Sequence, residues 1–296
     1  MWQIHLIELY CAVCKYYDTT IHVEVQRLSN NSRPKFTDQE LMTVYLWGTM
    51  KGLRSVKAIY TYTIMHLLEW YPALPSYQAF DRRLGEMGMA FAKLAECFIN
   101  NRLGDGYDLC SLVIDSMPIS LAKLSRADHA KVAQELCGKA YNSSRKEWYY
   151  GVKLHAVVHD RFKRLPALML AFLSPANVHD LPCAKQAMDN FKDKNRVLYA
   201  DKAYVDAQWA QTLALQNKVT LLTPHKRTRG EINPFPGGNA RDTFISSVRQ
   251  KIEIFFNWLH EKTGIQSASK VRSLKGLLFH TFGKLAAALA SLALGF

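Results

Sequence analysis

The sequence has little that would keep the chain from forming a hydrophobic core. Only 10 prolines and 15 glycines occur among its 296 residues, whereas 49% of the residues are hydrophobic. This balance excludes the collagen-like, low-complexity and intrinsically disordered classes. A chain of this length predicts one large domain, or one domain with a smaller partner.

The sequence also lacks an uninterrupted hydrophobic run of the roughly 20 residues that span a membrane. The best candidate lies near the C-terminus, where His280 and Lys284 interrupt it, and the remaining run, 285–296, is too short. The N-terminus has neither the basic region nor the small-residue cleavage site of a secretory signal. We therefore expect a soluble, cytoplasmic protein that has no membrane partner.

Cysteines are few and scattered, and only one close pair occurs. Cys11 and Cys14 form a Cys-x-x-Cys unit, whereas the other four cysteines stand apart. A zinc or redox site would need further ligands or a strand–helix context, and only His5 and His22 are near in sequence. We expect the cysteines to pack mainly as small hydrophobic side chains of an intracellular protein.

Acidic residues are scarce in the second half of the chain. Residues 1–138 hold 14 Lys and Arg against 14 Asp and Glu, whereas residues 139–296 hold 24 against 11 and carry the whole net charge of +13. Residues 262–296 contain five basic residues and no acidic one. The excess favours nucleic acid as a partner. An anionic lipid, an acidic protein, or a basic surface that serves only solubility are the alternatives.

The first 105 residues are typical of short helices. The segment Thr37-Asp38-Gln39-Glu40 is a capping box, and Ser55 and Ser76 stand where two further helices would begin. Three short helices suit a helix-turn-helix DNA reader as well as a plain helical bundle. In the first interpretation, three side chains of the third helix reach base edges: Gln78, Arg82 and Arg83.

After residue 105 the hydrophobic pattern changes to that of an α/β domain. Strands are predicted over 109–114, 149–159, 163–172, 196–201 and 219–223, and helices over 179–191, 206–216 and 246–263. A three-stranded meander followed by alternating helices and strands indicates a mixed sheet with helices on its faces. Residues 224–243, rich in Pro, Gly and Arg, are predicted to form an exposed loop.

Three carboxylates occupy notable places in this pattern. Asp115 and Asp201 each follow a short hydrophobic strand, so two such strands side by side would hold both carboxylates at one edge of the sheet. Glu253 lies among hydrophobic positions of the late helix, which would point it toward the sheet or its margin. Clustered carboxylates repel unless a cation such as Mg²⁺ neutralises them. The alternatives are turn formation by the aspartates and an ion pair of Glu253 with Arg249.

Four segments together resemble the DDE transposases of bacterial insertion sequences. They are Val-Ile-Asp-Ser at 113–116, Tyr-Gly-Val-Lys-Leu-His at 150–155, Ala-Asp-Lys-Ala-Tyr at 200–204, and Arg249-x-x-x-Glu253. The aspartates are 86 positions apart, and 52 separate Asp201 from Glu253. The resemblance extends from about residue 35 to 282. It departs from the family pattern at Ala203, where Gly is frequent, and at Ser246 and His260, where many members have Tyr and Lys.

The resemblance implies a ribonuclease-H-like catalytic domain over 106–296, with a basic loop at 224–243 and a C-terminal helix, preceded by a small all-α domain over 1–105. It implies a transposase that hydrolyses the ends of its element and joins them to target DNA. Asp115, Asp201 and Glu253 would be the catalytic residues and hold two Mg²⁺ ions, with Mn²⁺ as a substitute. Terminal inverted repeats and target DNA would be the partners of a homodimer or larger synaptic complex in the bacterial cytoplasm, at the nucleoid.

Under the same resemblance, basic side chains would hold DNA phosphates. The candidates in the second half are Lys153, His155, Lys202, Lys226, Arg227, Arg229, Arg249, His260 and Lys262. Alternatively His155 satisfies a neighbouring backbone group, and Trp258 either stacks on a base or packs in the core. Two other functions stay open. One is a ribonuclease-H-like nuclease without strand transfer, and the other is a DNA-binding protein descended from a transposase that no longer cleaves.

Overall fold

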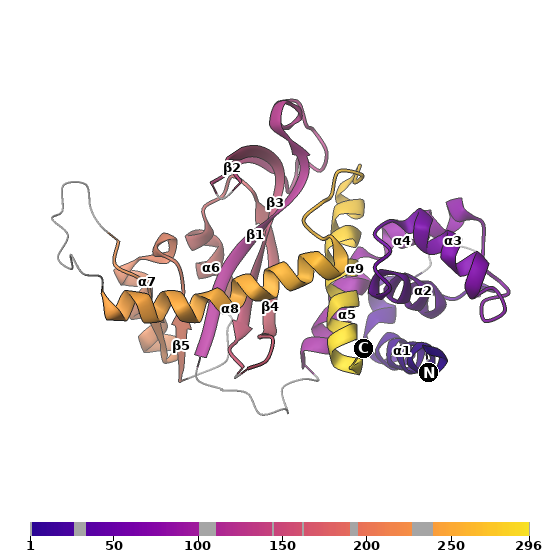
Figure 1. Ribbon diagram of the computed structural model, residues 1–296, viewed down its shortest axis with the longest axis horizontal. Helices are drawn as coiled ribbons and strands as arrows, with labels where there is room; N and C mark the ends of the chain where they lie inside the picture. Colours follow the sequence, from indigo (N-terminus) through magenta and orange to yellow (C-terminus); the bar gives the residue numbers. More distant parts are fainter. Residues whose placement is uncertain are drawn as a thin grey trace. The chain divides into compact units, whose positions relative to one another are not determined.

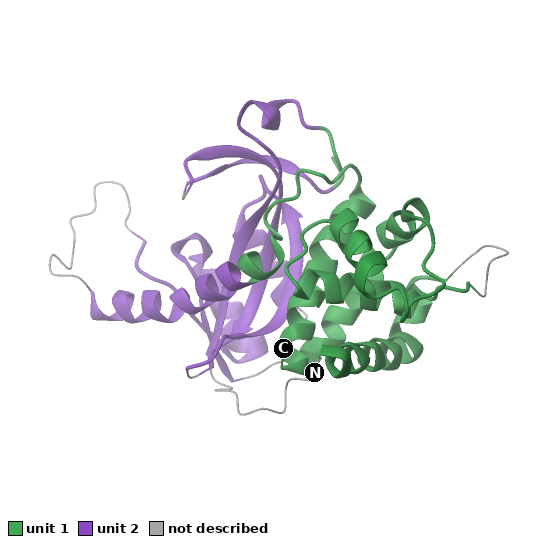
Figure 2. Cartoon of the chain, turned by 45° about the vertical axis from the view of Figure 1, so that its right-hand side comes forward, with its two compact units in different colours: residues 1–102, 131–135, 259–296 green, residues 103–130, 136–258 purple. Residues whose placement is uncertain are grey.

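The computed structural model describes residues 2–26, 34–100, 111–143, 145–161, 163–189, 195–226 and 239–295. The chain divides into two compact units, coloured separately in Figure 2. Unit 1 comprises residues 1–102, 131–135 and 259–296, and unit 2 comprises residues 103–130 and 136–258. The C-terminal segment from residue 259 therefore belongs with the N-terminal helices, whereas the sequence analysis placed it in the second domain.

Unit 1 is helical, and three of its helices begin at the capping residues that the sequence indicated. Its longer helices are α1 (Trp2–Tyr16), α2 (Asp38–Met50), α3 (Val56–His66), α4 (Tyr77–Glu86), α5 (Gly88–Asn100) and α9 (Leu274–Leu294). The capping box of Thr37 and Glu40 starts α2, and the side chains of Ser55 and Ser76 accept hydrogen bonds from backbone amides in α3 and α4. Five residues connect α2 to α3 and ten connect α3 to α4. These connections are longer than a helix-turn-helix turn and favour the helical-bundle alternative.

Helix α9 is the hydrophobic centre of unit 1, which explains why the C-terminal segment joins this unit. It packs against α5 and α2. Small residues permit the close approach: a Cβ at Gly283 would lie 2.8 Å from the Tyr45 ring, and one at Gly88 would lie 2.9 Å from Leu278. Its length and composition would let α9 cross a membrane, but 67% of its most hydrophobic window is buried. We therefore interpret α9 as a core helix.

The cysteine pair lies on α1 and does not pack in the core as a unit. Cys11 is exposed and Cys14 is half-buried, and both thiols are free. The prediction that Cys11 serves as a small core hydrophobe is therefore wrong. The buried side of α1 is formed instead by Leu6, Leu9 and Val13, which recur at helical spacing.

Unit 2 is built on a six-stranded mixed sheet (Figure 1). Its strands are β1 (Ser111–Lys123), β2 (Gly138–Asn142), β3 (Glu147–His159), β4 (Ala167–Pro175), β5 (Arg196–Tyr199) and β6 (Val219–Leu222). The order is β2-β3-β1-β5-β6, and β4 also pairs with β3. Strand β3 is antiparallel to β1, β2 and β4, whereas β5 is parallel to β1 and β6. This mixed topology confirms the ribonuclease-H-like fold.

Several details of the sheet differ from the prediction. Strand β4 spans Ala167–Pro175, whereas 163–172 was predicted, because its pairing with β3 runs from Ala167 to Pro175. Strand β1 does not end at Asp115 but continues to Lys123, because β3 pairs with it along that whole length. Strand β2 was not predicted. It is short and half-exposed, so it carries little of the hydrophobic pattern on which the prediction depended.

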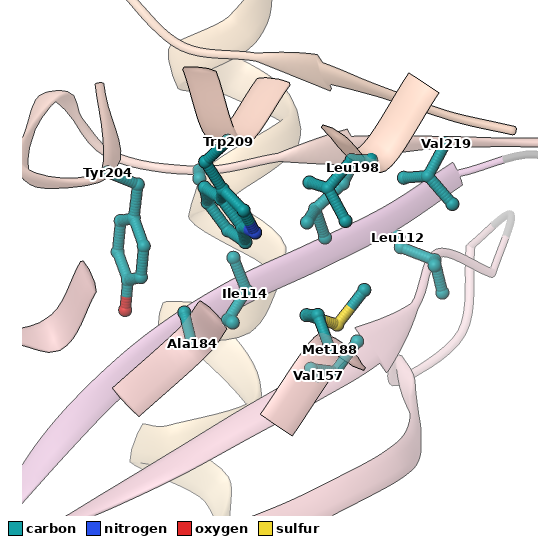
Figure 3. Packing of buried hydrophobic residues seen from close by; sticks show 11 residues of the cluster. Leu112, Ile114, Val157, Ala184, Met188, Leu198, Tyr204, Trp209 and Val219 are labelled. Atoms are coloured by element: carbon teal, nitrogen blue, oxygen red, sulfur yellow. The ribbon is translucent and has the colours of Figure 1, made fainter. Parts of the chain in front are cut away.

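Helices cover both faces of this sheet. Helices α6 (Asp180–Asp189) and α7 (Ala207–Thr212) pack on the face that carries Leu112, Ile114 and Val157, and Figure 3 shows this core. Side chains alternate along a strand, so Val113 and Asp115 point to the opposite face. Helix α8 (Ala240–Thr263), which begins six residues before its predicted start, runs across that face in Figure 1.

Candidate active site

Parallel pairing of β1 with β5 brings the two aspartates to the same level of the sheet. Ser111 pairs with Val197, and Val113 pairs with Tyr199. The same register, continued by two residues, sets Asp115 opposite Asp201. Asp115 is still within β1, whereas Asp201 follows the last residues of β5 and caps a short 3-10 turn, Lys202–Tyr204.

A single arginine of α8 joins the two carboxylates. The Nη2 atom of Arg249 lies 3.2 Å from Oδ2 of Asp115, and its Nη1 atom lies 3.3 Å from Oδ1 of Asp201. The guanidinium is 15% exposed, so water screens these ion pairs only in part. Arg249 therefore offsets the repulsion that two adjacent carboxylates would otherwise experience.

The two aspartates differ in their surroundings. The side chain of Asp115 is 20% exposed, and burial raises its pKa to about 6, with a smaller contribution from the nearby Asp201 carboxylate. The Ser116 amide, which donates a 2.8 Å hydrogen bond, and Arg249 act in the opposite direction. Asp201 is 39% exposed and accepts a 2.6 Å hydrogen bond from the Lys202 amide. Asp115 is thus the carboxylate that most needs a neighbouring cation.

Glu253 stands one helical turn after Arg249, but its side chain is exposed. Ile252 is fully buried and Ile254 is 56% exposed, so the buried stripe of α8 passes beside Glu253 and does not include it. Glu253 therefore lies at the margin of the buried face and does not point into the sheet. Within the described ranges, no group of three or more His, Cys, Asp and Glu side chains is arranged to hold a metal ion.

The residues present nevertheless fit a divalent cation. Asp115 and Asp201 offer carboxylate oxygens, the ligands that Mg²⁺ prefers. They already share one cationic group, the Arg249 guanidinium, which stands in for such an ion. Arg249 forms its ion pairs with these two aspartates. The alternative from the sequence, an ion pair between Arg249 and Glu253 one turn along the helix, is therefore not its role.

Lys153 and His155 lie on the other face of the sheet. Ser116 pairs with His155 and Pro118 pairs with Lys153, and antiparallel partners share a face. Because Asp115 alternates with Ser116, its carboxylate points away from both basic side chains. The resemblance assigned Lys153 and His155 to DNA, and this placement separates them from the carboxylate pair.

His155 is fully buried. Its Nε2 atom lies 2.7 Å from the Ser174 hydroxyl, and its ring stacks on Phe172 with centroids 4.6 Å apart. Burial lowers its pKa to about 4, so the imidazole is neutral near pH 7. His155 therefore satisfies a buried side-chain hydroxyl, whereas the alternative assigned it to a backbone group.

Two polar residues near the aspartates were not singled out from the sequence. Asp180, in the first turn of α6, forms an ion pair with Lys153 and accepts a 3.1 Å hydrogen bond from the Ser116 hydroxyl. Tyr204 is fully buried, and in the described part of the chain its hydroxyl has no hydrogen-bond partner. Burial and the nearby Asp180 and Asp115 carboxylates raise its pKa, so the phenol stays protonated. The sequence gave no signal for Asp180, because acidic residues are common at helix starts. Tyr204 lies in the Ala-Asp-Lys-Ala-Tyr motif, but the motif alone did not indicate a role for it.

The other basic candidates are spread over both units. Lys202 and Lys226 are exposed in unit 2, and Arg227 and Arg229 lie outside the described residues, as does most of the predicted loop 224–243. His260, half-buried, and Lys262, exposed, belong to the part of α8 in unit 1. Trp258 is half-buried and its ring lies 6.0 Å from Phe255, in agreement with core packing.

The three candidates on α4 differ sharply. Gln78 and Arg82 are exposed. Arg83 instead donates hydrogen bonds to both carboxylate oxygens of Asp38 (2.9 and 2.6 Å), to the Val25 carbonyl and to Glu86. Asp38 is only 5% exposed, so this ion pair is largely desolvated. The guanidinium of Arg83 is thus committed to holding α4 against α2.

We expect Arg83→Gln to lower the free energy of unfolding by about 3 kcal/mol, because the buried Asp38 would lose the Arg83 charge and the two hydrogen bonds that it donates. Arg82→Gln is the matched control: it removes the same charge from an exposed neighbour and should change stability by about 0.5 kcal/mol or less. Urea titrations of the two variants provide the measurement. Equal stabilities would show that the Arg83–Asp38 pair does not hold the helices together.

A comparison with protein families agrees with this geometry. A family model described as "Transposase DDE domain" matches residues 107–289. The matched segment contains both aspartates, Arg249 and Glu253. A search of curated proteins found no match.

Proposed function

Since this chain belongs to the family of transposases with a DDE domain, we propose that it cleaves DNA at the ends of a mobile element and joins those ends to target DNA. The observation that carries the proposal is the Asp115–Arg249–Asp201 arrangement, in which two strand-borne carboxylates share one cation. Holding two carboxylates this close costs free energy through their mutual repulsion, unless the pair serves to bind a cationic ligand.

In this proposal Asp115 and Asp201 hold divalent metal, Mg²⁺ or Mn²⁺, and Glu253 completes the set. The bound metal would supply an activated water and neutralise the charge that develops on the leaving oxygen. The half-buried position of Asp115 strengthens its attraction for a cation, because the surroundings screen charge less than water does.

The chain's own basic groups would position the DNA. Arg249 reaches the carboxylate pair with two nitrogens, so it would bind a phosphate brought to the same place. Lys202 follows Asp201 directly and is exposed, where it would hold a neighbouring phosphate. Asp180 and Ser116 would fix the strand that carries Asp115 through their hydrogen bond. Transposition also brings two ends together, so we include a homodimer or larger complex in the proposal.

One assay separates this function from its alternatives. DNA that flanks the gene and carries inverted repeats would be end-labelled and incubated with the protein and a circular target plasmid. Cleavage at the repeats with transfer of label to the plasmid is the expected result. Cleavage without transfer would favour a ribonuclease-H-like nuclease. Binding with no cleavage would favour a DNA-binding protein derived from a transposase.

We expect Arg249→Met to lower cleavage by about 10²-fold, the scale of losing one charged contact to a reacting group. Without metal, the variant should also melt at a lower temperature than the wild type, because Asp115 and Asp201 lose their shared counter-ion. Mg²⁺ should then raise the melting temperature more in the variant than in the wild type.

Arg241→Met is the control for Arg249→Met. Arg241 lies on the same helix and is 55% exposed, and its Nη1 atom makes a 3.7 Å ion pair with Asp242 and a 3.4 Å hydrogen bond to the Thr223 carbonyl. It should change neither the melting temperature nor its response to Mg²⁺. If Arg249→Met behaved like this control, Arg249 would not be balancing the two aspartates.

A further inference from the structure

Unit 1 contains a cavity whose lining is strongly basic. Its volume is about 940 Å³, and it lies between the α3–α4 region and the segment that leads from α8 into α9. The first region contributes Arg54, Lys57 and Arg82. The second contributes Lys270 and Arg272, and α9 itself contributes Lys275 and Lys284. Two parts of the chain that are distant in sequence thus direct seven cationic side chains toward one space.

Acidic side chains do not balance this charge. The lining includes only Asp81 and Glu86. Glu86 already pairs with Arg83, its oxygen 3.0 Å from Nη1. The cavity therefore has an excess of positive charge, which attracts an anion into it.

Lys284 is the most informative member of the set. It is 6% exposed, lies in the middle of the core helix α9, and lines the cavity. In the described part of the chain its ammonium donates a single hydrogen bond, 3.3 Å to the Gly264 carbonyl. An ammonium carries three donors, so two have no acceptor among the residues that the structure describes. Burial, together with Arg54, lowers its pKa to about 8. A hydrophobic residue would suit this helix better unless the charge serves a ligand.

The rim of the cavity is also suited to phosphates. Helix α9 begins there: Ser273 caps it, and Ser273, Lys275 and Gly276 all line the cavity. The first turn of a helix presents free amides and a positive dipole end to an anion. Lys57 is held in place by Tyr77, whose ring centroid is 4.6 Å from its Nζ atom. Lys270 and Lys275 are exposed at the opening.

We propose that this cavity binds backbone phosphates of double-stranded DNA, with Lys284 at its floor and Lys270, Lys275 and Arg82 at its rim. The proposal rests on the proposed function, since it supplies that function with a DNA contact separate from the carboxylate pair. In this proposal the basic C-terminal segment and the exposed face of α4 both contact DNA phosphates. The contact is to phosphates and therefore independent of base sequence.

The test uses the full-length chain and a fluorescently labelled duplex whose anisotropy is followed over a range of salt concentrations. Lys270→Gln/Lys275→Gln should weaken binding about tenfold, and the slope of log affinity against log salt should fall by about 2. Lys15→Gln/Lys35→Gln is the matched control, because both lysines are exposed in unit 1 and do not line the cavity. This control should change affinity and slope far less.

Lys284→Met gives a second, independent readout. It should weaken binding at least about fivefold and at the same time raise the melting temperature, because it replaces a buried charge with a hydrophobic side chain. A purely structural lysine would not produce these two opposite effects together.

The outcomes separate the inference from the proposed function. If the wild type binds DNA and the cavity double variant matches the Lys15/Lys35 control, the cavity is not the phosphate site and the inference is overturned. If the wild type itself binds no DNA at low salt, the proposed function fails first, and the inference fails with it.

Discussion

Asp115→Asn and Asp201→Asn are each expected to reduce cleavage of element-end DNA by more than about 10³-fold while the protein stays folded. Each change removes one negative charge at nearly constant volume. The two carboxylates lie opposite each other on β1 and β5, and both reach Arg249. Losing either one removes half of the oxygen ligands that the pair offers. Cleavage of labelled duplex on a denaturing gel provides the measurement.

The control for these variants is Asp128→Asn. Asp128 also lies in unit 2 and pairs with a lysine, Lys139, but it is 49% exposed and its ion pair is separate from those of Arg249. Its replacement should leave cleavage unchanged. Glu253→Gln addresses the third acid, whose side chain is exposed. A similarly large loss would place Glu253 in the metal site, whereas retained cleavage in any one variant would remove that residue from the catalytic set.

Removal of divalent metal should abolish cleavage entirely. Excess chelator leaves Asp115 and Asp201 paired with the Arg249 guanidinium, which cannot activate a water. Adding Mg²⁺ or Mn²⁺ should restore the reaction. Ca²⁺ should permit DNA binding with little cleavage, because its larger and looser coordination misplaces the reacting oxygens.

DNA binding in chelator is the internal control for this experiment. The unit 1 cavity and the exposed Lys202 need no metal, so anisotropy should still report binding. Cleavage that persists in excess chelator would defeat the metal proposal. It would require a different nucleophile and a different set of catalytic residues.

Much of the fold could be predicted from local signals in the sequence. The starts of α2, α3 and α4 were predictable because Thr37, Ser55 and Ser76 accept hydrogen bonds from amides only a few residues away. The sequence also allowed the prediction that Asp115 and Asp201 lie side by side in the sheet, since both follow short hydrophobic runs that become neighbouring parallel strands. The continuation of β1 past Asp115 could not be predicted, because it depends on pairing with β3, whose partner residues lie 26 to 39 positions away along the chain.

Long-range packing limited the rest. Nothing local in 274–294 indicates that this helix fills the centre of a unit formed by the N-terminal helices, or that Lys284 faces a cavity with Arg54. The engagement of Arg83 depends on Asp38, 45 residues earlier. The face of Lys153 and His155 followed from strand alternation, but whether Asp115 shares that face depends on the register with β1. Such facts require the tertiary fold.

In the proposed mechanism, Asp115 and Asp201 are brought together to hold a divalent cation. Titration of Mn²⁺ into the full-length protein, followed by electron paramagnetic resonance of the free ion, tests it most directly. The wild type and the Asp128→Asn control should bind Mn²⁺, whereas Asp115→Asn/Asp201→Asn should lose that binding and still unfold cooperatively. Equal Mn²⁺ binding by the double variant and the wild type would contradict the claim.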